Sequence, residues 1–294
     1  MYNTCNVAIT KNEDESRALL EGLDLIKADK LFTKDDIVMI VPNFVSANKP
    51  HPSSGITVGT HTLRTLIQWV KRLRVKKIII ACGAGGNTLD VMRKVGYDKI
   101  IEAESCEFVD FNTGPYVELA INHHIINKLQ VNQVLFEKTK LISYTQLKQH
   151  EEATMSASIK NVMMSIPSTE EHGSPKKDKG IHRDLHGFIA KMAENNKIDL
   201  SIVSCNPAMV GTGPINGIPI HTGLVICGDN PICCDTVVAR LLGFKPQAVY
   251  YLYLLEQLGY KETDINKMNI YGLKLKEAEL IFAQKVYGEN FTVD

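Results

Sequence analysis

The sequence KKIIIACGAGGNTLD (residues 76–90) places a run of apolar, mostly β-branched residues directly before a glycine cluster and a polar segment. The run 76–82 predicts a buried strand because it is short, apolar and followed by turn residues. Asn87 and Thr88 are residue types that begin helices. The stretch therefore predicts a strand that passes through a tight turn into a helix, which is the repeating unit of α/β proteins.

The same alternation recurs on both sides of this stretch. Short apolar runs predict strands at residues 37–43, 76–82, 106–111, 139–145, 199–205 and 222–228. Segments of helical period predict helices at residues 60–74, with Thr60 as the cap, and at 181–192, 231–243, 246–260 and 273–288. We therefore predict an α/β fold with a mainly parallel or mixed central sheet, flanked by helices, and one domain over residues 1–294.

Composition limits the class of protein. The chain has 294 residues with 33 basic and 33 acidic side chains, so the net charge gives no case for binding nucleic acid or a membrane surface. A signal core and a membrane-spanning apolar run are both missing from the sequence, which favours a cytoplasmic protein. Seven cysteines, an odd number, favour thiols over a disulfide framework. If the protein is a cytoplasmic enzyme, a homodimer is the commonest assembly to expect.

Three polar, glycine- and proline-rich segments follow the predicted strands or the opening segment: residues 43–59, 168–180 and 206–223. We interpret residues 168–180 as an irregular polar loop. Open α/β sheets bind ligands where loops leave the carboxyl ends of strands. The functional site is therefore expected at these strand-end loops.

The glycine cluster allows two interpretations. Gly83, Gly85 and Gly86 could bring backbone amides close to the anionic group of a cofactor at the start of a helix. The cluster matches neither the dinucleotide-binding pattern nor the P-loop. The alternative is a tight strand-to-helix turn with Asn87 or Thr88 as the cap, and the sequence slightly favours it.

Histidines and cysteines raise the question of a metal. His182 and His186 are four residues apart on a predicted helix and could bind one ion, with His150, His61 or Asp235 as a third ligand. Partly packed histidines are the alternative. Cys227, Cys233, Cys234 and Cys205 could likewise hold a soft metal or an iron-sulfur cluster, but buried thiols are the favoured interpretation.

The segment LKQHEEATMSASIKN (residues 147–161) carries cations among small hydroxyl residues. We expect it to follow a strand, because a core strand could not bury such a mixture. Lys148, His150 and Lys160 would suit a carboxylate or a phosphate, and a partly desolvated lysine or histidine can exchange protons near neutral pH. This segment predicts one wall of an anion site.

Several segments in the same order resemble the family called domain of unknown function 362, including LISYTQLKQH, SASIKNVMMSIP, IHRDLH, MVGTGPINGIPI and NPICCDTVVARLLGFKP. The resemblance covers residues 37–260. Members are widespread in anaerobes, and some are fused to ferredoxin-like iron-sulfur modules. Its recurrent positions correspond here to Asn43, His61, Lys148, His150, Lys160, Asn161, His182, Gly211, Gly213, Pro214 and Asp235. The chain departs from the pattern at Val41, Ser204 and Asn230.

Three hypotheses follow. The first is an enzyme that acts on a small anion, with His150, Lys148, Lys160 and His182 as catalytic residues and with Asn43, His61, Asn161, Gly211 and Gly213 binding the substrate. The second is a redox or metal-dependent protein, with His182, His186, Asp235 and Cys233 as ligands and a possible ferredoxin-like partner. The third is a binding or scaffold protein without catalysis.

Overall fold

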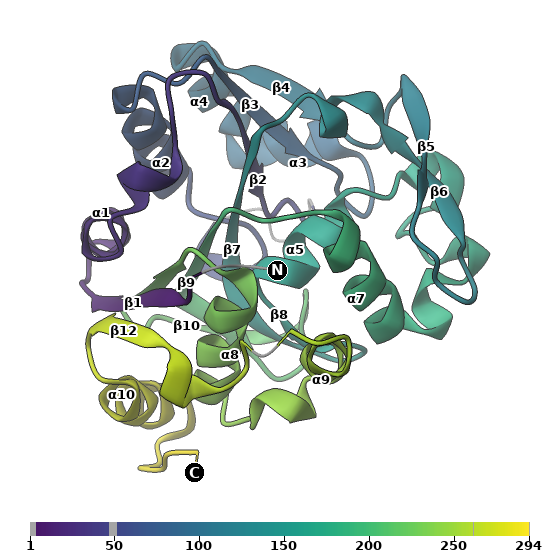
Figure 1. Ribbon diagram of the computed structural model, residues 1–294. Helices are drawn as coiled ribbons and strands as arrows, with labels where there is room; N and C mark the ends of the chain where they lie inside the picture. The colour runs from purple at the N-terminus through teal and green to yellow at the C-terminus, as the bar shows by residue number, and fades with distance from the viewer. Residues whose placement is uncertain (1–3, 47–51, 261, 294) are drawn as a thin grey trace.

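The computed structural model describes residues 4–46, 52–260 and 262–293. Its core is one sheet of ten strands, and a separate hairpin lies beside it (Figure 1). The strands are β1 Asn6–Lys11, β2 Ile37–Pro42, β3 Lys77–Cys82, β4 Glu107–Asp110, β5 Tyr116–Ala120, β6 Lys128–Asn132, β7 Lys140–His150, β8 Thr154–Ser156, β9 Leu200–Val210, β10 Ile218–Ile220, β11 Leu224–Gly228 and β12 Asn269–Gly272.

Helices cover both faces of this sheet. They are α1 Glu15–Leu25, α2 Thr60–Arg72, α3 Thr88–Val95, α4 Tyr97–Ala103, α5 Ser158–Ser165, α6 Thr169–His172, α7 Leu185–Asn195, α8 Pro231–Leu241, α9 Tyr250–Gln257 and α10 Leu275–Tyr287. A 3₁₀ segment, η4, covers Asp178–Arg183. Across the described residues, none of the helices is both long and apolar enough to cross a membrane.

The strand order is β12-β1-β11-β9-β7-β2-β3-β4, with β10 paired to β9 and β8 paired to β7. Strands β9, β7, β2, β3 and β4 run parallel to one another, whereas β11 is antiparallel to both β1 and β9. The fold class predicted from the sequence, α/β with a mainly parallel or mixed sheet flanked by helices, is therefore confirmed.

Alternating side chains of the strands pack into two separate cores. On β2, Val38 and Ile40 join the core under α1 and α2, while Met39 and Val41 join the core under α5, α7 and α8. Helix α1 lies close to β11 because it has a glycine at the contact: a Cβ on Gly22 would lie 2.8 Å from the Cys227 sulfur. The period of two along each strand thus divides the apolar residues between the two faces.

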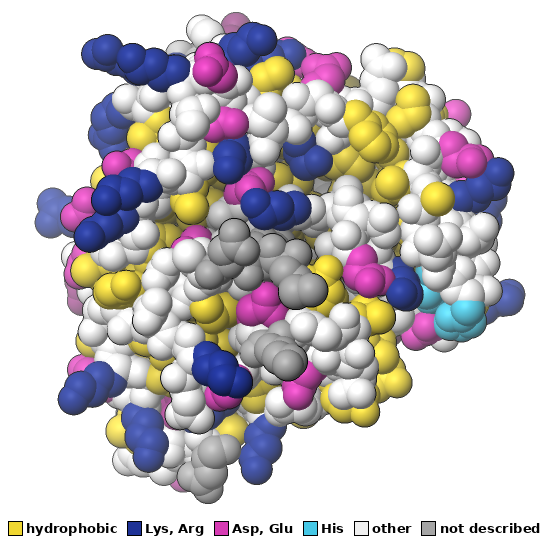
Figure 2. Space-filling model, viewed as in Figure 1, with side chains coloured by type: hydrophobic (Ala, Val, Ile, Leu, Met, Phe, Trp, Pro, Cys, Tyr) yellow, Lys and Arg dark blue, Asp and Glu magenta, His cyan; other side chains and the backbone are white. Residues whose placement is uncertain are grey.

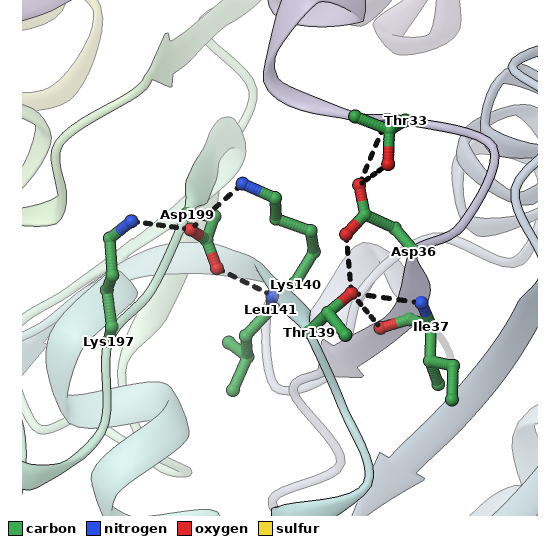
Figure 3. A network of polar contacts seen from close by, with 8 residues as sticks. All are labelled: Thr33, Asp36, Ile37, Thr139, Lys140, Leu141, Lys197 and Asp199. Atoms are coloured by element: carbon green, nitrogen blue, oxygen red, sulfur yellow. Dashed lines mark hydrogen bonds and ion pairs between the residues drawn. The ribbon is translucent and has the colours of Figure 1, made fainter.

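A polar network ties together the starts of the parallel strands (Figure 3). The Thr139 hydroxyl, just before β7, donates to Asp36 at 2.5 Å and accepts from the Ile37 amide of β2 at 3.0 Å. Asp199, just before β9, accepts from the Leu141 amide of β7 at 3.0 Å and lies 2.8 Å from Lys197. These contacts hold β2, β7 and β9 in register at one end, which leaves their carboxyl ends for the site.

Several predicted boundaries are wrong. Helix α2 begins with Gly59 as its N-cap, so Thr60 is its first residue and not its cap. Strand β9 continues to Val210, and β10 pairs back onto it, where the sequence predicts a loop over residues 206–223. Strands β1, β5, β6, β8, β10 and β12 were not predicted. Within the predicted loop 43–59, residues 47–51 lie outside the described residues.

The expectation that all the cysteines are thiols is wrong for two of them. Cys5 and Cys233 form a disulfide with their Cα atoms 6.0 Å apart, which joins the start of β1 to the first turn of α8. The other five are free, and four of these are buried, as expected for small apolar residues in a core. Figure 2 shows positive and negative side chains interspersed over one face of the molecule, in keeping with the balanced composition.

Candidate active site

A cavity of about 510 Å³ lies beyond the carboxyl ends of β2, β3 and β7. Its wall combines the end of β2, the loop after β3, the β7–β8 turn, helix α5 and the segment 174–182. The lining residues are Asn43, Phe44, Val45, Ser46, Gly83, Gly85, Gly86, His150, Glu151, Glu152, Ser156, Lys160, Asn161, Met164, Ser165, Ser174, Pro175, Lys176, Lys177, His182, Pro214 and Ile215. The cavity therefore lies at the edge of the sheet that the strand-end rule indicates.

Strand β7 is longer than predicted and includes the first cation of the site. It continues through an irregular register at Gln146 and Lys148 and ends at His150. Lys148 is fully buried, so the expectation that a core strand could not bury this mixture is wrong. Among the described residues its ammonium donates one hydrogen bond, to the Gln146 carbonyl at 3.3 Å, and Lys148 does not line the cavity.

Helix α5 brings Lys160 and Asn161 to the cavity. Asp235 on α8, which is fully buried, fixes the start of this helix: its carboxylate accepts from the Ser158 amide at 2.8 Å and the Ile159 amide at 3.1 Å. Lys160 is 9% exposed. Within the described part of the chain, no group accepts a hydrogen bond from its ammonium, so this cation faces the cavity without a direct partner.

Burial changes the protonation of both lysines. It lowers the pKa of Lys148 to about 7, with a further contribution from the charge of Lys160. Burial also lowers the pKa of Lys160 to about 8, and the charge of Glu152 opposes that shift. Near neutral pH each lysine can therefore gain or lose a proton, which ordinary surface lysines do not.

His150 is a neutral imidazole at the turn between β7 and β8. Its Nδ1 accepts from the amides of Glu152 at 3.1 Å and Ala153 at 3.2 Å, so the ring proton is on Nε2. Burial, together with the charges of Lys160 and Lys148, lowers the pKa of His150 to about 2. His150 can therefore donate a hydrogen bond from Nε2, but it does not supply a positive charge.

The predicted helical pair His182 and His186 is wrong. His182 lies in η4 and His186 in α7, and the chain leaves helical geometry at Asp184, which caps α7. His182 faces the cavity, and its Nδ1 hydrogen-bonds the Glu152 carboxylate. His186 instead uses Nδ1 to accept from the Tyr251 amide at 3.1 Å.

Glu152 makes His182 a candidate base. When Nδ1 of His182 donates to the carboxylate, Nε2 carries a lone pair; this atom is buried and has no partner among the described residues. The other Glu152 oxygen lies 2.7 Å from the Lys177 ammonium. The contact of Glu152 with His182 was not predicted, because no pattern in the sequence indicates that η4 folds back onto the β7–β8 turn.

Residues 168–180 are more ordered than the predicted polar loop. They contain α6 and part of η4, and Lys176 within them is 2% exposed. The Lys176 ammonium donates to the carbonyls of Gly83 at 2.8 Å, Met164 at 3.1 Å and Ser165 at 3.1 Å. This lysine therefore fastens the segment to the ends of β3 and α5, and it was not predicted.

The glycine turn lines the cavity, but the amides of Gly83 and Gly85 are already occupied. The Gly83 amide donates to the Ser165 hydroxyl at 2.9 Å, and the Gly85 amide donates to the Val45 carbonyl at 3.3 Å. Asn87 caps α3 by accepting from the Asp90 amide at 3.0 Å. The geometry matches the tight-turn interpretation, and an anion could not use the amides of Gly83 and Gly85 without breaking these bonds.

Some of the predicted substrate-binding residues line the cavity and others do not. Asn43 and Asn161 line the cavity, and the buried Asn43 Oδ1 has no partner within the described residues. Gly213 accepts from the Glu151 amide at 3.2 Å and so supports the rim, while Gly211 donates to the Gln149 side chain. His61 is exposed on α2 and does not line the cavity.

The predicted metal ligands do not converge. Cys233 is bonded to Cys5, and Asp235 is occupied by two amides and the Tyr251 hydroxyl. Among the described residues, His123, His124 and Asp184 alone place three possible ligand atoms together. There the Ile126 amide donates to His123 Nδ1, which leaves the proton on Nε2, the atom that faces Asp184 at 3.0 Å. That arrangement is a hydrogen bond and does not favour a metal site.

Comparisons with known proteins place the chain in context. Residues 38–240 match the model of the family described as domain of unknown function 362. A thylakoid-associated protein of Synechocystis sp. is 24% identical over 231 residues, which cover 78% of this chain and 70% of that protein. The lactate racemase apoprotein from Thermoanaerobacterium thermosaccharolyticum superposes with a TM-score of 0.43 and 17% identity. That alignment covers 79% of this chain but only 57% of the racemase chain.

Proposed function

The chain belongs to the family of domain of unknown function 362, and on that premise we propose that it is an enzyme acting on a small organic anion, a carboxylate or a phosphate. The substrate would bind in the cavity beside Lys160. The family description assigns no reaction, so the proposal depends on the chemistry of the cavity.

One observation carries the proposal: two buried lysines lie near each other, and no carboxylate of the described residues is bonded to either. Lys160 lines the cavity, and Lys148 is close enough for the charge of Lys160 to lower its pKa. Buried charges are normally paired, because an unpaired charge in a protein interior is costly. A bound anion would supply the missing partner, and its charge-assisted hydrogen bonds would be strong in this enclosed site.

The neighbouring groups support a catalytic role over simple binding. His182 lines the same cavity, and the Glu152 carboxylate holds its ring in the tautomer whose Nε2 carries a lone pair. A base oriented by a carboxylate, close to a site for the substrate anion, is the arrangement used in general acid–base catalysis. We assign Lys160 to substrate binding and His182 to proton transfer.

The test measures binding of a panel of carboxylates and phosphate esters by calorimetry. We expect the wild-type protein to bind at least one of them, and Lys160→Met to weaken that binding roughly tenfold or more, because a charge-assisted hydrogen bond is lost. Lys99→Ala is the matched control, since Lys99 is an exposed lysine on α4 outside the cavity.

Turnover separates the two assigned roles. Once a ligand is found, His182→Gln should abolish its conversion while leaving its affinity within about threefold of wild type. Equal binding by wild type and Lys160→Met would refute the assignment of the anion to this cavity.

A further inference from the structure

We propose that Lys160 acts as a nucleophilic amine and forms an iminium with a substrate that carries both a carbonyl and an anionic group, such as an oxo acid or an aldehyde phosphate. The inference rests on the proposed function, because it names the substrate class of the same site. It is nevertheless separable from it, since a cavity can bind anions without covalent chemistry.

The placement of Lys160 is that of a reactive amine. Its side chain is 9% exposed, yet it lines the cavity, so a ligand in the cavity can reach it. Within the described residues nothing accepts a hydrogen bond from Nζ, whereas the other buried lysine of the wall, Lys176, donates to three carbonyls. Lys176 is therefore held by hydrogen bonds to the backbone, whereas Lys160 is free to react.

Two features around Lys160 disfavour its positive charge. Its side chain is buried, and it is the third residue of α5, where the helix dipole is positive. Glu152, from the β7–β8 turn, acts in the opposite direction and favours the charge, but both of its oxygens are bonded to Lys177 and His182. A lysine in a desolvated site is an activated nucleophile.

The protonation state agrees with this geometry. Burial lowers the pKa of Lys160 to about 8. Near neutral pH it therefore holds an unprotonated amine in a fraction of molecules about two orders of magnitude larger than an ordinary lysine does. The proton that the Lys148 and Lys160 pair retains still provides a cation for the anionic group of the substrate.

The proposed step balances without another reagent. The Lys160 ammonium first releases a proton to water in the cavity. Its neutral nitrogen then attacks the carbonyl carbon, a C–N bond forms as the C=O π bond breaks, and the carbonyl oxygen takes up a proton from that water. The nitrogen then loses a proton to His182 Nε2, and the hydroxyl group leaves as water when that proton is returned to it. The products are one water and an iminium that carries the positive charge of the original ammonium.

The experiment uses pyridoxal 5′-phosphate, a probe that carries an aldehyde and a phosphate, followed by borohydride reduction and peptide mass spectrometry. At pH 7.5 we expect Lys160 to be modified at least about tenfold faster than the exposed Lys99, because more of it is unprotonated. The rate of modification of Lys160 should rise with a pH midpoint near 8, because burial lowers the pKa of this amine. A merely accessible lysine would instead show the midpoint of an ordinary lysine, about two pH units higher.

Lys160→Arg distinguishes this inference from the proposed function. Arginine keeps the positive charge but lacks the amine, so the reduced adduct should disappear while inorganic phosphate still binds. If wild-type Lys160 reacts no faster than Lys99, or if its rate has the pH midpoint of an ordinary lysine, the amine role is overturned. Phosphate binding that is lost in Lys160→Met would then still support an anion site.

Discussion

Folding removes the Lys148 ammonium from water. Among the described residues it then donates one hydrogen bond, of 3.3 Å, to the Gln146 carbonyl of β7. Such a group lowers stability, because the unfolded chain can hydrate the same charge freely. Sites that keep a destabilising group usually do so for function. Lys148 is therefore better explained by the anion site than by the needs of the fold.

We predict that Lys148→Met raises the free energy of unfolding at pH 7 by about 1–3 kcal/mol, since each pKa unit corresponds to about 1.4 kcal/mol. The pKa of Lys148 is lowered in the folded state, so between about pH 7 and 10 the unfolded chain binds more protons and wild-type stability rises with pH. The gain from Lys148→Met should therefore shrink as the pH approaches 10.

Urea unfolding at pH 6, 7, 8 and 9.5 measures this gain, with Lys99→Met as the control for an exposed lysine. A Lys148→Met protein that is less stable than wild type at pH 7 would show that the ammonium makes contacts worth more than its desolvation cost.

Some of the individual residues of the candidate site could be predicted from the sequence. Lys148, His150 and Lys160 were grouped because they follow a predicted strand and lie among small hydroxyl residues, and the structure places them together. Glu152 and Lys176 were missed. Their roles depend on where residues 168–183 fold back, which is a tertiary contact that no local pattern encodes.

Among the elements, α5 depends on α8 for its position. Asp235 accepts from two amides at the start of α5 and from the Tyr251 hydroxyl of α9 at 2.9 Å. Burial raises the pKa of Asp235 to about 7, although these three bonds oppose the shift. One carboxylate thus joins three helices, and the third residue of α5 is Lys160.

We predict that Asp235→Ala lowers the free energy of unfolding by roughly 2–4 kcal/mol, because two buried amides lose their acceptor. Tyr251→Phe removes only one hydrogen bond and should cost about 1 kcal/mol. Tyr253→Phe, on the exposed side of α9, is the control and should change little. Chemical denaturation compares the three variants, and equal losses in Asp235→Ala and Tyr253→Phe would contradict the capping role.

Element boundaries show where local patterns fail. The helix predicted over residues 181–192 breaks at Asp184, whose side chain caps α7 by accepting from the Gly187 amide at 3.1 Å. An aspartate can lie inside a helix or cap its start. Here Asp184 caps α7, and its carboxylate also contacts His123. Strand β9 was cut short for a similar reason, because Pro207 and the glycines after it resemble a turn.

For the whole molecule, the Cys5–Cys233 disulfide closes a loop with a sequence separation of 228 residues. A cross-link over a long loop restricts the unfolded chain strongly, so Cys5→Ala should lower the free energy of unfolding by about 2–4 kcal/mol. Thiol titration in denaturant should find five reactive thiols in the untreated protein and seven after reduction. Seven before reduction would show that the bond does not form.

The overall architecture was the most predictable level. Six apolar runs and the helical segments between them were enough for the α/β class, because each parallel strand is buried on both faces and therefore stands out as an apolar run. The pairing of β1 with β11 and β12 at one edge of the sheet was not predicted. Strand β1 resembles an ordinary N-terminal segment, and its partners β11 and β12 lie near the other end of the sequence.

That pairing has a consequence for synthesis of the chain. Strand β1 is made well before its neighbours in the sheet, which are β11, Leu224–Gly228, and β12, Asn269–Gly272. At about 5–20 residues per second, translation from β1 to β11 takes roughly 10–40 s. During that interval the apolar residues Val7, Ala8 and Ile9 lack both of the strands that pair with β1 in the finished sheet. A nascent chain therefore carries this apolar segment without its partners until β11 and β12 have been made.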